Sequence, residues 1–227
     1  MSKIVWDGTG QRFYEDGVDR GVLFVKNGNI YDKGVAWNGL TAVNESNEGG
    51  DLQDIWADNI RYLTLRSQER FSGTIEAYTY PDEFKVCDGS VKVADGVFVG
   101  QQPRKRFGFS YRSMVSNDEG TEYYKIHLVW NALANPSGKD HATRNDTPDP
   151  ATFSWEFTTD PVEITEANAK PSAHMVIDSR YTPDEKLKLL EKKIYGVDAS
   201  VDPAVEGADP ELPTPDEVIL LIGTAQG

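Results

Sequence analysis

Apolar and polar residues alternate with a period of two along most of this chain, which is typical of β-strands that bury one face. Asn27-Gly28 and Asp95-Gly96 are favoured two-residue hairpin turns between such runs. The pattern predicts strands near 22–25, 30–31, 62–65, 73–80, 91–93, 97–99, 107–112, 123–130, 153–158 and 173–177. Their number and spacing predict a mainly β body of the sandwich or barrel type.

One segment has helical periodicity instead. Thr182-Pro183-Asp184-Glu185 offers an N-cap threonine, a proline at the first helical position and a capping-box glutamate. Leu187, Leu190 and Ile194 follow at helical spacing, and Gly196 is a stop signal. We therefore expect one amphipathic helix that covers a face or an edge of the sheet.

The last 31 residues, 197–227, differ from the rest of the chain. They contain seven acids, no base and four prolines, so they carry half of the net charge of −14. This composition predicts an extended acidic arm beside a folded domain that spans 1–196. The arm ends in five consecutive apolar residues, and we expect Leu220 and Leu221 among them to add to a sheet edge or groove of the same or another subunit.

Two polar stretches, 44–59 and 135–150, are predicted to be long loops. Loops of this length in a compact domain usually have a function or are disordered. The first contains Ile55 and Trp56, two apolar side chains in a polar setting. Either this loop folds back onto its own body, or it docks onto a neighbouring molecule with Ile55 and Trp56 as anchors.

Composition narrows the class of protein. The apolar fraction of 38% permits a sizeable core, and no run of apolar residues approaches the length of a membrane-spanning helix. The first seven residues reach an acid without the apolar stretch of a signal peptide, so we expect assembly in the cytoplasm. The excess of acids argues against tight binding to phosphate backbones.

The sequence offers no pattern of catalytic or metal-binding residues, so we expect neither an enzyme nor a cofactor or metal. His127, His141 and His174 occur singly, and the first and last lie on the more polar faces of their strands, as solvated or hydrogen-bonded histidines do. Cys87 is expected to be a buried structural thiol. Phosphate-binding loops and nucleophile elbows are missing.

One basic run, Arg104-Lys105-Arg106, precedes an aromatic strand. A functional interpretation is contact with nucleic acid or with an acidic partner. The structural interpretation, which we favour, is that these charges guard an aggregation-prone strand or form a salt bridge between subunits.

Several stretches resemble the major tail tube proteins of long-tailed, non-contractile phages and prophages of Gram-positive bacteria. These are DGVDRGVL at 16–23, KGVAWNGLTAVNE at 33–45, IEAYTYPDEF at 75–84 with CDG at 87–89, GQQ at 100–102 with FGF at 107–109, YKIHLV at 124–129 with ALA at 132–134, and LPTPDEV at 212–218. They occur in consistent order along the chain.

The resemblance implies a two-sheet β-sandwich with one flanking helix, assembled as hexameric rings that stack into a hollow tube. It implies no catalytic residues. It also implies tape measure, tail terminator and distal tail proteins as partners, transient passage of DNA, and a place in the virion tail. An alternative from another class is a carbohydrate-binding β-sandwich module, which would need aromatic side chains along one solvent-facing surface.

Overall fold

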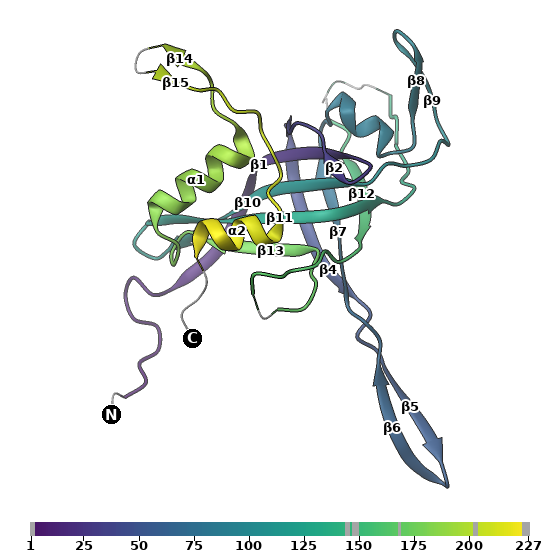
Figure 1. Ribbon diagram of the computed structural model, residues 1–227, viewed down its shortest axis with the longest axis vertical. Coiled ribbons are helices and arrows are strands. Elements are labelled where there is room, and N and C mark those ends of the chain that lie inside the picture. Colours follow the sequence, from purple (N-terminus) through teal and green to yellow (C-terminus); the bar gives the residue numbers. More distant parts are fainter. Residues whose placement is uncertain (1–2, 144–145, 147–149, 168, 202–203, 224–227) are drawn as a thin grey trace.

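The computed structural model describes residues 3–143, 146, 150–167, 169–201 and 204–223 (Figure 1). Strands dominate it, which confirms the mainly β fold. The strands are β1 (Phe13–Asn27), β2 (Ile30–Tyr31), β3 (Val35–Trp37), β4 (Leu40–Glu48), β5 (Leu52–Ala57), β6 (Ile60–Arg66), β7 (Arg70–Ala77), β8 (Val91–Ala94), β9 (Val97–Val99), β10 (Phe107–Asn117), β11 (Glu122–Ala134), β12 (Phe153–Thr159), β13 (His174–Asp178), β14 (Ser200–Val201) and β15 (Ala204–Val205). The helices are the 3₁₀ turn η1 (Asp82–Val86), α1 (Asp184–Tyr195) and α2 (Pro215–Ile222).

Nine strands form one antiparallel sheet in the order β2-β1-β10-β11-β12-β7-β4, with β3 beside β1 and β13 beside β11. The long strand β11 is the branching point, because its residues 125–129 pair with β13 and its residues 132–134 pair with β12. A first layer of β1, β10, β11 and β13 is thus crossed by a second layer of β12, β7 and β4 (Figure 1). The expected sandwich is therefore built from two parts of one hydrogen-bonded sheet.

The main core lies between these two layers and is rich in aromatic side chains. Trp37 packs edge-on against Phe109 at 5.5 Å and against Trp155 at 5.6 Å between ring centroids. Phe84, from the 3₁₀ turn, closes one end with no exposed surface. Cys87 is fully buried beside it, and burial raises the pKa of its thiol to about 12. The expected structural thiol is confirmed.

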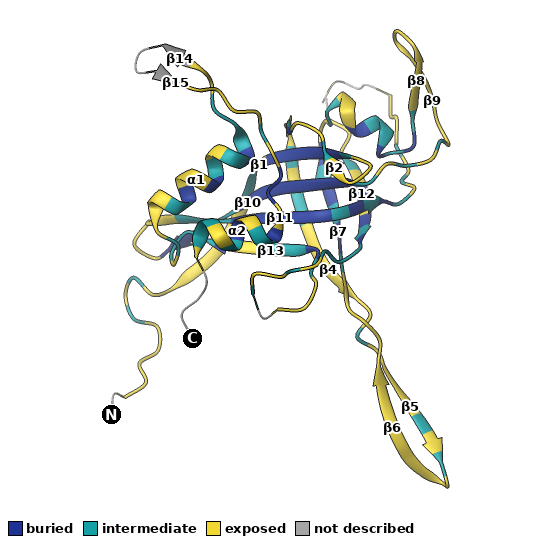
Figure 2. Cartoon of the chain, in the orientation of Figure 1, coloured by how far each residue is buried: buried dark blue, intermediate teal, exposed yellow. Residues whose placement is uncertain are grey.

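A second core lies on the opposite face of the first layer, beneath the helices (Figure 2). Helix α1 buries the predicted stripe of Leu187, Leu190 and Ile194 there, and Gly196 ends the helix with a φ of 78°. The predicted cap is wrong in detail, since the N-cap position is occupied by Pro183 in place of Thr182 and no side chain makes a capping hydrogen bond there. Within the described ranges no helix is long and apolar enough to span a bilayer.

The C-terminal segment differs from the extended arm that its composition suggests. Residues 215–222 form a second helix, α2, which packs beside α1 and does not add as a strand. Leu212 and Val218 are buried in the second core, and the Trp130 indole donates a hydrogen bond to the Pro213 carbonyl at 2.9 Å. The proline-broken stretch therefore lies across the sheet as a strap. The domain boundary after residue 196 stays a prediction, although residues beyond it complete this core.

The stretch 44–59 is likewise not a loop. Strand β4 continues to Glu48, an irregular break with positive φ at Gly49 and Gly50 follows, and β5 begins at Leu52. The sequence of this stretch lacks a clear alternation of apolar and polar residues because most of its side chains are exposed on both faces. The second predicted loop, 135–150, is irregular over 135–143, and part of it lies outside the described residues. The hairpin turn after β1 is centred on Gly28-Asn29, one residue later than predicted.

Candidate functional site

The hairpin formed by β5 and β6 projects far from the body of the subunit (Figure 1). Ile55 pairs with Leu63 and Gln53 pairs with Leu65, so these positions share one face of the two-stranded ribbon. Asp54 and its partner Thr64 lie on the other face. The hairpin therefore presents an apolar stripe along one face.

Among the described residues, neither this stripe nor the other apolar side chains of the hairpin pack against a core. Leu65 is 53% exposed, Ile60 is 60% exposed and Trp56, near the tip, is 67% exposed. No hairpin residue belongs to either core cluster of the described chain (Figure 2). An isolated two-stranded hairpin is at best marginally stable in water, and contiguous exposed apolar surface usually marks an interaction site. Folding back of Ile55 and Trp56 onto the body is thus wrong for the subunit, while docking onto a neighbour stays a prediction.

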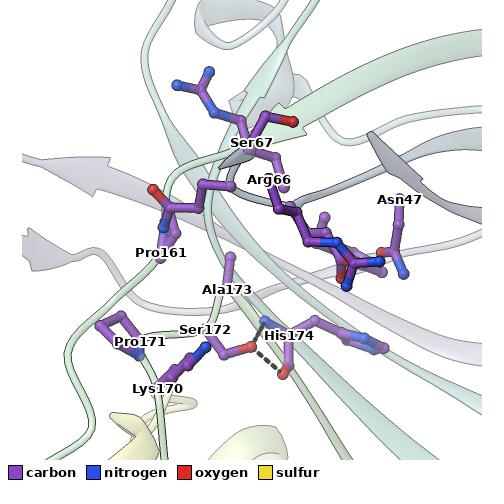
Figure 3. A pocket seen from close by; sticks show the side chains of 13 residues that line it. Asn47, Arg66, Ser67, Pro161, Lys170, Pro171, Ser172, Ala173 and His174 are labelled. Carbon is purple, nitrogen blue, oxygen red and sulfur yellow. Dashed lines mark hydrogen bonds between the residues drawn. The ribbon is translucent and has the colours of Figure 1, made fainter. Parts of the chain in front are cut away.

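A cavity of about 800 Å³ lies where the hairpin joins the body (Figure 3). Arg66, Ser67 and Asn47 line it from the hairpin side, and the segment from Lys170 to His174 lines the other side. Ser172 closes that segment with hydrogen bonds to the backbone of His174. The cavity walls thus come from the base of the hairpin and from the segment that leads into β13.

The basic run lies at the start of β10 and makes contacts inside its own chain. Arg106 donates a hydrogen bond to the Asn131 carbonyl at 2.8 Å and forms a salt bridge with Asp160 at 2.5 Å. Lys105 donates to the side chain of Asn27. Arg104 is half-buried and lies against Gly89. Two of the three charges therefore anchor the loop before β10, which favours a structural role over nucleic-acid contact.

Leu220 and Leu221 lie on different sides of α2. Leu221 packs against the second core, whereas Leu220 is 62% exposed. The helix begins with a complete capping box between Thr214 and Glu217. Of the two predicted contact residues, Leu220 is the more exposed, and contact of either with another molecule stays a prediction.

A polar cluster joins three side chains that the sequence presents as isolated. Glu45 from β4, His127 from β11 and His174 from β13 meet between the two layers. Glu45 Oε1 lies 2.9 Å from His127 Nδ1 and 4.0 Å from His174 Nε2, and the two imidazole nitrogens are 3.3 Å apart. The interpretation of these histidines as hydrogen-bonded is confirmed. Only the pairing of β11 with β13 reveals their proximity, because 47 residues separate them.

The surroundings of this cluster set its charge. The hydrogen bond from His127 holds the pKa of Glu45 at about 2 despite partial burial, so Glu45 is a carboxylate at neutral pH. Burial lowers the pKa of His174 to about 4, which leaves this imidazole neutral. The Tyr111 hydroxyl donates to Glu45 Oε1 at 2.5 Å, and burial raises the pKa of that hydroxyl. One carboxylate and a neutral imidazole thus face His127 across a short gap.

Comparison with known proteins finds a distant structural similarity. Searches with family models and against curated proteins find no match. Among solved structures, the chain is similar to one in a cryo-EM structure of the anti-feeding prophage (AFP) baseplate, 6-fold symmetrised. The two share 12% identity and a TM-score of 0.35 over 78% of this chain and 97% of the other. At these values the functional assignment has to rest on the residues of this chain.

Proposed function

We propose that this chain is a structural subunit of a phage tail tube, which assembles into hexameric rings that stack and conduct DNA to the host. The sequence resemblance suggests this class. The observation that carries the proposal is the projecting β5–β6 hairpin, whose apolar side chains pack against neither core of the described part of the chain. A subunit that must contact copies of itself needs such a surface.

The geometry suits head-to-tail association. A closed ring, and a stack of rings, brings different surfaces of one subunit together, so a projecting element on one copy fits a receiving surface on the next. The β8–β9 hairpin also projects and exposes Val93 and Phe98 (Figure 2). The proposed roles are ring-to-ring docking for the β5–β6 hairpin and contact between neighbours for the β8–β9 hairpin.

The charge of the chain fits a conduit for DNA. With a net charge of −14, the subunit repels phosphate overall, and a lumen that bound DNA tightly would retain it. The subunit would act in the virion tail after assembly in the host cytoplasm. Tape measure, tail terminator and distal tail proteins are the partners that such a tube requires. No catalytic step belongs to this proposal.

The carbohydrate-binding alternative has less support. It requires aromatic side chains along a solvent-facing surface of the sheet, yet Trp37, Trp130 and Trp155 on the main sheet are each at most 2% exposed. Exposed aromatic side chains do occur, among them Trp56 and Tyr62 on the narrow β5–β6 hairpin and Phe13 and Tyr14 at the start of β1, but they are spread over different elements. A two-stranded ribbon offers no concave surface for a sugar chain.

The test is electron microscopy and light scattering of the purified full chain across a concentration series. We expect six-fold rings, and tubes at high concentration or after addition of virion-derived tail tips as seeds. Monomers or two-fold dimers under all of these conditions would refute the proposal. A glycan array provides the parallel test of the alternative.

A further inference from the structure

The polar cluster of Glu45, His127 and His174 occupies the place where the two layers cross without backbone pairing. Strands β4 and β13 are both edge strands in their parts of the sheet. Glu45 comes from β4 in the second layer, and the two histidines come from the adjacent strands β11 and β13 of the first. The contacts of Glu45 with the two histidines therefore join β4 to strands with which it forms no sheet hydrogen bonds.

The distances within the cluster suit a metal ion. In a tetrahedral zinc site with bonds of about 2.0–2.1 Å, ligand atoms lie roughly 3.4 Å from one another. Here the separations among Glu45 Oε1, His127 Nδ1 and His174 Nε2 are 2.9, 3.3 and 4.0 Å. Small rotations about side-chain bonds that change these separations by about half an ångström would equalise them. Two imidazole nitrogens and one carboxylate are also a donor set that zinc prefers.

Neighbouring residues hold these donors in orientation. The other ring nitrogen of His127, Nε2, lies 2.9 Å from the Ser113 hydroxyl, which leaves Nδ1 to face the cluster. Tyr111 stacks on His127 at 4.5 Å, and Phe71 stacks on His174 at 4.1 Å between ring centroids. These contacts fix the ring planes, so little ordering would be needed when a metal binds.

The cluster can also be reached from solvent. Glu45 and His127 line a cavity of about 390 Å³ on one side of it, and His174 lines the cavity of about 800 Å³ at the hairpin base on the other. An ion could thus enter without unfolding of the sheet. Water could complete its coordination on either side.

We propose that Glu45, His127 and His174 form a binding site for one divalent transition-metal ion, with zinc as the preferred metal. The ion would tie β4 to β11 and β13 and so fasten the two layers at their crossing. This site belongs to the single subunit and does not depend on the proposed function in a tail tube. The competing explanation is a hydrogen-bonded trio that binds no metal.

The experiment uses the untagged full chain after removal of metal with a chelator. Calorimetric titration with zinc chloride should give one ion per chain, and cobalt chloride should give the visible absorption bands of a low-coordinate nitrogen- and oxygen-ligated ion. Magnesium and calcium, which prefer sites made of oxygen ligands, should give no comparable heat. Zinc should also raise the midpoint of thermal unfolding.

Matched variants separate this site from adventitious binding. His174→Gln removes a ligand and should weaken zinc binding by at least about 100-fold, whereas Ser113→Ala should weaken it by about 10–100-fold through loss of orientation. His141→Gln removes an exposed histidine outside the cluster and should have no effect. Circular dichroism checks that each variant is folded.

Two kinds of result would overturn the proposal. One is the absence of one-to-one zinc binding by the wild-type chain. The other is binding that His141→Gln weakens as much as His174→Gln does. Neither readout depends on tube assembly. Failure of the metal-site proposal would therefore leave the proposed function untouched, and failure of the proposed function would leave the metal site untouched.

Discussion

Excision of the β5–β6 hairpin tests whether this element serves assembly and not the fold. Asp51 and Ser67 flank it. The Ser67 backbone N–H donates to the Asp51 carbonyl at 3.0 Å, and the Asp51 backbone N–H donates to the Ser67 hydroxyl at 3.0 Å. Replacing Leu52 through Arg66 with Asn-Gly should therefore close the chain with a two-residue turn. Because no excised residue belongs to a core cluster, the unfolding free energy should change by no more than about 1–2 kcal/mol, mostly through a shorter loop.

The effect on assembly should be much larger. Full burial of a large apolar side chain contributes about 1.5–3 kcal/mol, and Trp56, Ile60, Leu63 and Leu65 are 67%, 60%, 38% and 53% exposed. Burial of the remaining surface would contribute about 1 kcal/mol for each side chain, or roughly 4 kcal/mol before the cost of ordering the hairpin. Since 1.4 kcal/mol corresponds to a factor of ten, the critical concentration for tubes should rise by about 10²–10³-fold.

Sedimentation and electron microscopy measure that threshold, and thermal unfolding measures the fold. Leu65→Asp should reproduce much of the assembly defect. Leu189→Asp is the matched control, because this leucine is 51% exposed on α1. The reasoning is refuted if the excised protein forms tubes at the wild-type threshold, or if excision lowers the unfolding midpoint sharply.

Three further predictions concern the fold. Leu212→Ala should destabilise the subunit by about 2–5 kcal/mol in urea titrations, because this side chain is 4% exposed in the second core. Leu220→Asp should leave the stability nearly unchanged. Equal losses of stability in the two variants would contradict the docking of residues 212–213 on the sheet. The hydrogen bond that Arg180 donates within its salt bridge to Asp178 lowers the pKa of Asp178 in the folded state. The ionised pair should therefore stabilise the fold fully above about pH 4, the pKa of an unfolded aspartate, and this stabilisation should be lost as the pH falls through the lower pKa of the folded state. Asp178→Asn should abolish this part of the acid-dependent loss of stability in thermal scans. Burial raises the pKa of Cys87 to about 12, so a thiol reagent at pH 8 should label it only after denaturation, and rapid labelling of the native chain would refute its burial.

Much of the fold follows from local patterns in the sequence. Alternation over β10, β11, β12 and β13 identifies these strands, although β10 and β11 lie between the two cores and bury side chains on both faces. The spacing of Leu187, Leu190 and Ile194 identifies α1, because this helix buries one face against the second core. Helix α2 also has a local signal that was outweighed by composition. Thr214-Pro215-Asp216-Glu217 repeats the sequence at the start of α1, Thr182-Pro183-Asp184-Glu185. In α2 these residues form the complete capping box.

The β5–β6 hairpin shows where local patterns lose their value. Alternation predicts residues 62–65 of β6, whereas β5 falls in a stretch predicted to be a loop, because an element with no buried face in its own subunit need not alternate strictly. The hairpin turns at Asp58-Asn59, where both residues have positive φ, whereas Gly49 and Gly50 lie at its base. Pairing with the opposite strand is what defines it.

Only the tertiary structure brings the residues of the polar cluster together. Glu45, His127 and His174 lie on three strands that meet through the branching of β11 and the crossing of β4 over the first layer. Their spacing in sequence carries no metal-binding pattern, because donors from different strands become neighbours through sheet register and not through chain proximity. Local periodicity thus determined which segments are strands and helices, while the order and crossing of those strands determined which side chains can act together.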